Sequence, residues 1–231
     1  KWLTANLRKG QRLGFDPWLT TVDQAERFDF ACRAAGARLV ICDIDPDRLN
    51  GTAEKIRSMG GEVLSLPCDV SDSAAVDAMF TQAAEHFGTV HVLVNNAAVI
   101  PARPADQKRR SEHYAYLTTP EPRRSLGFTS AMSDEEWLRF WNVNVHGVFY
   151  CTRAALRLME PQRYGRIVNI ASVAGISAMS VHSPHYSATK GAVVAFTKAM
   201  AAEVAGANIQ VNAIAPGGVF TPDFEAYLQT L

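Results

Sequence analysis

Short apolar runs separated by amphipathic stretches make up most of the chain after residue 30. Unbroken apolar runs are typical of strands that are buried on both faces of a sheet. Such runs lie at 38–42, 62–66, 90–94, 165–170 and 209–214. Stretches with helical spacing lie between them, at 47–59, 73–87, 133–159 and 186–205. This alternation predicts an α/β protein, a Rossmann-type doubly wound parallel sheet with helices on both faces, in a single domain.

Helix boundaries are marked by residues that cap helix ends. Gly88 follows the stretch at 73–87 and predicts its end, and Ser133 with Glu136 forms a capping box at the start of 133–159. Two segments lack this organisation. Residues 1–30 are irregular and mixed in charge, and residues 99–131 carry four prolines, a run of three basic residues and little periodicity. We interpret 99–131 as a long loop, of a length that is uncommon in compact domains unless the loop is functional or mobile.

Composition excludes several classes of function. The chain has 23 basic and 23 acidic residues and a net charge of zero, which disfavours binding to nucleic acid or to an anionic membrane. No apolar run approaches a membrane span, and no signal-peptide pattern opens the sequence. The four cysteines lie far apart, without the spacing of metal ligands. We therefore expect a cytoplasmic protein without a metal site.

Ligands of parallel sheets bind beside the carboxyl ends of the strands, so polar residues there are the candidates for chemistry. Asp43 ends the run at 38–42, where a carboxylate can accept both hydroxyls of an adenosine ribose and repel a 2′-phosphate. An ordinary turn aspartate is the alternative. Two further strand ends carry small or polar residues, where a flat ligand can approach the backbone: Asp69 and Val70, and Asn95, Asn96, Ala97 and Ala98.

Tyr186 and Lys190 provide the strongest indication of catalysis. Four positions apart on one predicted helix, they share a face. A free tyrosine has a pKa of about 10, and a fixed cation nearby favours the phenolate and lowers that pKa. Ser172 follows the strand at 165–170, where its hydroxyl can hold a substrate oxygen that Tyr186 protonates. We therefore predict proton transfer by Tyr186.

These motifs, in this order, resemble those of the short-chain dehydrogenase/reductase family, and specifically its 3-oxoacyl-acyl-carrier-protein reductases. The match adds Asn144, in Asn142–Gly147, and the loop after 209–214. The resemblance implies four catalytic positions, Asn144, Ser172, Tyr186 and Lys190. Tyr186 would act as general acid or base, and Lys190 would also contact the nicotinamide ribose. Asn144 would extend a proton path through a water. The implied cofactor contacts are Asp43, Asp69, Val70, Asn96, Ala97, Ala98, Tyr186, Lys190, Pro216, Gly217, Val219 and Thr221.

The sequence departs from this family in one loop and at both ends. Residues 99–131 are about two dozen residues longer than the resemblance requires, so they would be an inserted loop near the active-site rim. No apolar strand or Gly-rich phosphate-binding turn precedes Ala31. We expect that roughly 20 residues of this unit are missing between Phe30 and Ala31, or that the turn is deleted. Residues 1–30 would be an N-terminal extension and 31–231 the oxidoreductase domain, with its C-terminal end missing after Leu231.

Several predictions about cofactor, substrate and partners depend on this resemblance. Asp43 favours NAD(H), with NADP(H) possible, in an enzyme acting on a small-molecule carbonyl or secondary alcohol. Alternatives are a 3-oxoacyl thioester reductase using NADPH or NADH, and an inactive cofactor-binding module. Helix 186–205 is apolar on nearly all sides, which predicts a homodimer or homotetramer. Two further sets of residues could touch substrate or be ordinary loop residues: His182 and His185, and Arg103, Arg109, Arg110, Arg123 and Arg124. His146 is interpreted as a packing residue.

Overall fold

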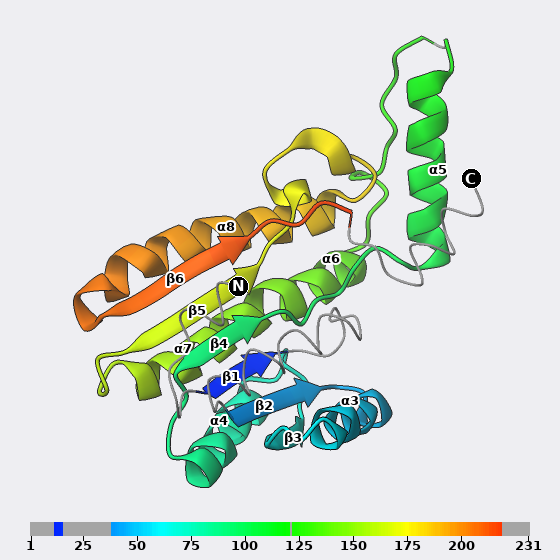
Figure 1. The fold of residues 1–231 in the computed structure, drawn as a ribbon. Helices are drawn as coiled ribbons and strands as arrows, with labels where there is room; N and C mark the ends of the chain where they lie inside the picture. The colour runs from blue at the N-terminus through cyan, green and yellow to red at the C-terminus, as the bar shows by residue number, and fades with distance from the viewer. Residues whose placement is uncertain (1–11, 16–37, 121, 219–231) are drawn as a thin grey trace.

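The computed structural model describes residues 12–15, 38–120 and 122–218 of the chain. Six parallel strands form one sheet, in the order β3-β2-β1-β4-β5-β6. The predicted parallel α/β architecture is therefore confirmed, and Figure 1 shows the strands running in one direction. The strands are β1 (Arg12–Phe15), β2 (Arg38–Asp43), β3 (Val63–Pro67), β4 (Val92–Asn95), β5 (Gly165–Ile170) and β6 (Ile209–Ile214).

Helices cover both faces of this sheet. The α-helices are α3 (Pro46–Ser58), α4 (Ser73–Phe87), α5 (Pro104–Thr118), α6 (Asp134–Trp141), α7 (Val148–Met159) and α8 (Pro184–Val204). A π-helix, η2 (Asn142–Gly147), joins α6 to α7, and the short helices η3 (Val173–Gly175), η4 (Ala178–Ser180) and η5 (Ala205–Ala207) flank α8. Among the described residues, no helix is long and apolar enough to cross a membrane. The cytoplasmic location stays a prediction.

Alternation along β2 separates the two apolar cores. Leu39 and Ile41 pack with α3 on one face, while Val40 and Cys42 pack into the larger core on the other. That larger core joins α4, α7 and the end of α8 to β5 and β6. The predicted stop of α4 is confirmed, because Gly88 caps the helix with a φ of 85°, a conformation that costs glycine little.

Two segments differ from the sequence prediction. Residues 12–15 form β1 in the middle of the sheet, paired with β2 and β4, although the sequence indicated no strand before residue 31. Pairing on both sides supplies the stabilisation that this short, partly charged segment lacks. The expected Gly-rich turn and the junction of Phe30 with Ala31 lie outside the described residues, so a missing segment there stays a prediction.

The inserted segment 99–131 is not a structureless loop, because it contains the 15-residue helix α5. Pro104 begins the helix and the Asp106 carboxylate accepts a hydrogen bond from the Arg103 N–H at 3.0 Å, so both residues favour a helix start. The buried side chains of α5 are Asp106 and His113. Because both are polar, the sequence showed no apolar periodicity that would predict this helix. Figure 1 shows α5 beyond the carboxyl ends of the strands, standing away from the sheet.

Candidate active site

Ser172 lies at the carboxyl edge of the sheet, two residues after β5. It is buried, and its Oγ accepts a hydrogen bond from the Ala174 N–H at 3.1 Å. Gly175, at the end of the same turn, packs against the backbone of α8. A Cβ on Gly175 would lie 2.5 Å from the Lys190 carbonyl carbon, so only glycine allows the turn to approach α8 this closely.

Tyr186 and Lys190 reach the same place from the first turns of α8. The Ser172 side chain lies close enough to the Tyr186 phenol to lower its pKa by hydrogen bonding. The Lys190 Nζ donates a hydrogen bond to the Ile170 carbonyl at 2.7 Å and lies 5.8 Å from the centre of the Tyr186 ring. The structure therefore brings Ser172, Tyr186 and Lys190 together at the end of β5, where the sequence placed them.

Burial sets the protonation of this group. It lowers the pKa of Lys190 to about 8, because the ammonium is taken out of water. Burial also raises the pKa of Tyr186, and the hydrogen bond with Ser172 offsets that rise only in part. The direction for Tyr186 is opposite to the lowering by Lys190 that the sequence predicted. The physical reason is that the Lys190 Nζ is directed to the Ile170 carbonyl, while the phenol is desolvated.

Asn144, the fourth predicted position, is fully buried in the π-helix η2. Its amide accepts a hydrogen bond from the Val99 N–H at 2.7 Å and donates to the Val99 carbonyl at 3.0 Å. It also donates to the Thr189 hydroxyl at 3.2 Å, and that hydroxyl donates to the Tyr186 carbonyl at 2.9 Å. Asn144 thus ties the segment after β4 to the helix that carries Tyr186. Its role in a proton path stays a prediction.

Asp43 ends β2, and its side chain is buried with an exposed fraction of 4%. Its Oδ1 accepts a hydrogen bond from the Asp45 N–H at 2.9 Å, whereas Oδ2 has no hydrogen-bond partner among the described residues. A buried carboxylate oxygen without a donor is unfavourable. A ribose hydroxyl would supply the missing donor, so this residue fits the adenosine half of a dinucleotide.

A cavity of about 420 Å³ opens beside Asp43, at the carboxyl ends of β2, β3 and β4. Small or apolar side chains form much of its wall, which suits a flat ring. Arg48, Arg103 and Arg139 add positive charge. Four other predicted cofactor contacts line this cavity: Asp69, Val70, Ala97 and Ala98.

The remaining predicted cofactor contacts fall in three places. Asn96 is buried directly after β4. The Pro216 carbonyl accepts a hydrogen bond from the Val173 N–H at 3.0 Å, so the segment after β6 lies beside the turn that follows Ser172. Gly217 follows and is exposed. Two predicted contacts lie outside the described residues: Val219 and Thr221.

The histidines near Tyr186 do not face solvent. His182 is 6% exposed and His185 is fully buried, so neither lies open at the mouth of the site. Burial lowers the pKa of His182 to about 4, helped by Arg110, which leaves its imidazole neutral at pH 7. His146 is exposed. Its interpretation as a packing residue is wrong, because η2 turns Asn144 inward and His146 outward.

The arginines of segment 99–131 bind groups of the protein itself. Arg103 and Arg109 form ion pairs with carboxylates of α5 and α6, and an Arg110 Nη donates to a backbone carbonyl at 3.4 Å. Arg123 and Arg124 lie over the ring of Tyr116, with 5.2 and 6.0 Å from guanidinium to ring centre. Binding of a substrate phosphate by these residues stays a prediction, and for Arg109 it would compete with the protein's own carboxylates.

Sequence reasoning missed the buried charges around His185. Asp106 and Glu136 both approach this histidine, from α5 and α6. The capping box did identify Glu136, and the Ser133 Oγ indeed accepts a hydrogen bond from its N–H at 3.2 Å. The Glu136 carboxylate, however, binds two Arg139 nitrogens at 3.0 Å each. Nothing in the spacing of these residues along the chain showed that they meet.

Comparison with known proteins agrees with this geometry. Residues 30–230 match the family model of the short chain dehydrogenases. The chain is 35% identical over 81% of its length to the (2S)-[(R)-hydroxy(phenyl)methyl]succinyl-CoA dehydrogenase subunit BbsD of Thauera aromatica, of which it covers 65%. It is 32% identical over 81% of its length to the 3-oxoacyl-[acyl-carrier-protein] reductase FabG of Thermotoga maritima, of which it covers 66%. The chain thus spans less than two thirds of the length of these curated relatives.

Solved structures show the same fold. An NAD⁺-bound xylitol dehydrogenase is 26% identical, with a TM-score of 0.75 over 95% of this chain and 75% of that one. A variant of actinorhodin polyketide ketoreductase with NADPH is 29% identical, with a TM-score of 0.77 over 97% of this chain and 77% of that one. With the family model matched over residues 30–230 and the parallel sheet and Ser172, Tyr186 and Lys190 in place, this chain belongs to the short-chain dehydrogenase family.

Proposed function

We propose that this protein is an NAD(H)-dependent oxidoreductase that interconverts a carbonyl compound and a secondary alcohol. The observation that carries this proposal is the convergence of Ser172, Tyr186 and Lys190 at the end of β5. The ligand cavity at neighbouring strand ends supports it. When bound, a nicotinamide cofactor supplies or accepts the hydride, and the protein provides positioning and proton transfer.

Each of the three side chains has a distinct part in carbonyl reduction. The Tyr186 phenol donates its proton to the substrate oxygen as the carbon receives hydride. The Ser172 hydroxyl donates a hydrogen bond to the same oxygen and so fixes the carbonyl against Tyr186. The charged Lys190 stabilises the phenolate that remains after proton transfer. Oxidation of the alcohol uses the same groups in reverse.

We assign the cofactor preference to Asp43. Its unpartnered Oδ2 favours the free hydroxyls of NAD(H), and its charge repels the 2′-phosphate of NADP(H). Relatives of known structure were solved with either cofactor, so the comparison does not decide the preference and Asp43 carries the assignment.

A 3-oxoacyl thioester reductase is the second candidate. In its favour are two curated relatives whose names specify thioester substrates, a 3-oxoacyl-[acyl-carrier-protein] reductase and a (2S)-[(R)-hydroxy(phenyl)methyl]succinyl-CoA dehydrogenase subunit. An inactive cofactor-binding module is less favoured, because such a module has no need of Ser172, Tyr186 and Lys190 together.

We also propose assembly as a homodimer or homotetramer through the outer face of α7 and α8. Phe149 of α7 is 42% exposed and lies against Phe196 of α8, with 6.3 Å between ring centres. Phe196 is partly buried, so Phe149 presents an exposed aromatic surface beside the small-residue helix α8. Such a surface favours burial against a second copy. Sedimentation analysis tests this, and a monomer at micromolar concentration would contradict it.

Fluorescence titration with NADH and NADPH, followed by activity assays, tests the function. We expect NADH to bind at least about tenfold more tightly than NADPH, and this ratio to collapse in Asp43→Ser. Asp47→Ser, which removes an equal charge from the exposed first turn of α3, should leave the ratio unchanged. A preference for NADPH in the native protein would overturn the assignment to Asp43.

Substitution of the proton donor tests the chemistry. Tyr186→Phe should lower kcat on the order of 10²- to 10⁴-fold with the dissociation constant of NADH unchanged. Tyr164→Phe is the matched control, since Tyr164 packs on His91 and Arg166 at the far end of β5. Full activity of Tyr186→Phe would refute the proposed role.

A further inference from the structure

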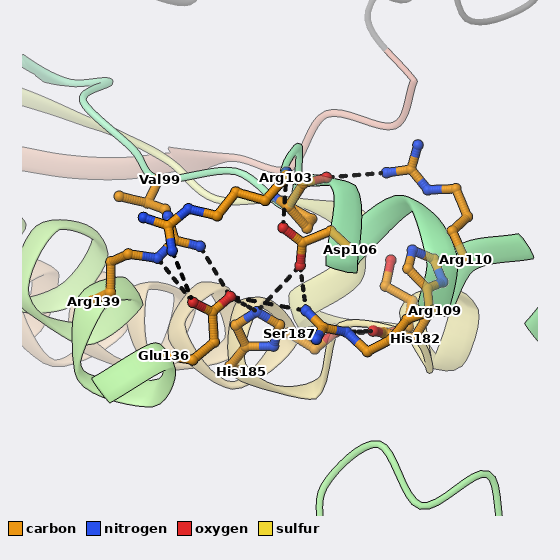
Figure 2. A network of polar contacts seen from close by, with 12 residues as sticks. Val99, Arg103, Asp106, Arg109, Arg110, Glu136, Arg139, His182, His185 and Ser187 are labelled. Atoms are coloured by element: carbon orange, nitrogen blue, oxygen red, sulfur yellow. Dashed lines mark hydrogen bonds and ion pairs between the residues drawn. The ribbon is translucent and has the colours of Figure 1, made fainter. Parts of the chain in front are cut away.

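A cluster of charged side chains joins the inserted helix α5 to the start of α6 and the start of α8 (Figure 2). Its centre is buried, with exposed fractions of 1% for Asp106 and 0% for His185. The cluster includes His185, the residue that precedes Tyr186. It consists of Arg103, Asp106, Arg109, Glu136, Arg139 and His185.

Arg109 makes the contacts that connect α5 with the active-site segment. One guanidinium nitrogen binds the Asp106 carboxylate and lies 3.8 Å from the Glu136 carboxylate. The Nε donates a hydrogen bond to the His182 carbonyl at 3.3 Å. His182 also contacts His113 of α5, with 3.4 Å between the two Nδ1 atoms. Helix α5 therefore holds the backbone and the side chain of the segment that leads into Tyr186.

Asp106, Glu136 and His185 could also hold a metal ion, since one ligand atom of each lies within 4.8 Å of the others. The arginines argue against a bound cation. The Arg109 guanidinium already contacts both carboxylates, and Arg139 binds Glu136 through two nitrogens. A divalent cation would add charge to a buried cluster in which three guanidinium groups already face two carboxylates. The geometry therefore favours an ion-pair network.

The start of α8 depends on this network, because its own capping is weak. Ser183 is the N-cap residue but makes no side-chain capping hydrogen bond. Its neighbour His185 packs edge-on against Phe140 at 4.0 Å between ring centres, and Phe140 also contacts the Tyr186 ring at 6.3 Å. Contacts from α5 and α6 thus replace the local interactions that normally fix a helix start.

We propose that Asp106 and Arg109 are positioning residues for proton transfer: by holding residues 182–185, they keep the Tyr186 phenol in hydrogen-bonding contact with Ser172. This inference rests on the proposed function of Tyr186. It gives the inserted helix α5 a task in the reaction, although neither residue contacts the phenol. A shift of about 1 Å in a reacting group can cost on the order of 10²-fold in rate, so a displaced helix start would be visible in kcat.

The test compares Arg109→Met and the double variant Asp106→Leu/Arg109→Met with the control Lys108→Met. The double variant removes both buried charges and so avoids leaving Asp106 unpaired. Lys108 is exposed on the same helix and pairs only with Glu112, at 3.8 Å, among the described residues. We expect kcat to fall about 10- to 100-fold in both cluster variants, with the dissociation constant of NADH within twofold of native. The control should behave as the native protein.

Two further measurements separate positioning from a structural role. Amide hydrogen exchange at 183–187 should be faster in the double variant than in the control. This measurement does not depend on catalytic activity. In a Tyr186→Phe background, Arg109→Met should cause no further loss of kcat, because its effect passes through the phenol. Unchanged exchange, a kcat within twofold of native, or a stoichiometric metal ion in the purified protein would each overturn the proposal. Full activity of Tyr186→Phe alone would instead identify a failure of the proposed function.

Discussion

Gly175→Ala tests whether the close approach of the Ser172 turn to α8 sets the geometry of the site. A Cβ there would lie 2.5 Å from the Lys190 carbonyl carbon and 2.6 Å from the Gly191 nitrogen. Ordinary contact begins at 3.4 Å, so the turn and the helix must separate by 0.9 Å, the difference from 2.5 Å. Both neighbours are backbone atoms of a packed helix, so they cannot rotate away as a side chain would.

The expected result is a loss of rate larger than the loss of stability. Separating Ser172 from Tyr186 by this distance should lower kcat on the order of 10²-fold. Overpacking of a tight site typically costs about 1–3 kcal/mol in the free energy of unfolding. Steady-state carbonyl reduction at saturating NADH measures the first quantity, and urea denaturation measures the second.

Gly51→Ala is the matched control. Gly51 lies inside α3, and a Cβ there would meet no atom within 4 Å. We expect this variant to be more stable by about 0.5–1 kcal/mol with kcat unchanged, because alanine is favoured over glycine in a helix. If Gly175→Ala kept kcat within twofold of native, the idea that this contact positions Ser172 would be refuted.

Three further predictions concern buried polar groups. Asn144→Ala leaves the Val99 N–H and carbonyl without their partner, and should cost about 2–3 kcal/mol of unfolding free energy in urea; an unchanged midpoint would contradict it. Lys190 is charged below its pKa of about 8, so the rate of carbonyl reduction should fall as the pH rises through 8, and a pH–rate profile flat from 7 to 9.5 would contradict this. The pKa of His182 is lowered to about 4 in the folded state from 6.5, so the unfolded state binds the proton first and stability is lost as the pH falls from 6.5 to 4. The loss should be about 2 kcal/mol between pH 7 and 5 at roughly 1.4 kcal/mol per unit below 6.5, and His182→Gln should lack it.

The sequence pattern predicted the elements that bury an apolar face. Strands β2 to β6 and helices α3, α4 and α8 lie where apolar runs and helical spacing indicated, because burial of those residues is what stabilises them. Strand β1 was not predicted, because Arg12–Phe15 is not an apolar run. This strand is stabilised by its pairing with β2 and β4. Helix α5 was not predicted either, because its buried face consists of the polar residues Asp106 and His113.

The candidate site was predictable in its residue types and only partly in its contacts. Tyr186 and Lys190 lie four positions apart on one helix, and a parallel sheet places Ser172 at the same edge, so local geometry sufficed. Predicting that Asp106 meets His185 would require knowing how the inserted 15-residue helix α5 packs against the start of α8. No periodicity encodes such a contact between segments far apart in the chain.

The protonation of the site favours one direction of the proposed reaction. Burial raises the pKa of Tyr186 and lowers that of Lys190 to about 8, so near pH 7 the phenol holds its proton while the ammonium keeps its charge. That state is ready to donate a proton to a carbonyl oxygen. Alcohol oxidation needs the phenolate, which the positive charge of Lys190 stabilises. Lys190 loses that charge above pH 8. The structure therefore favours reduction near neutral pH. Oxidation would require the pKa of Tyr186 to fall below that of Lys190, so that the phenol ionises while Lys190 is still charged.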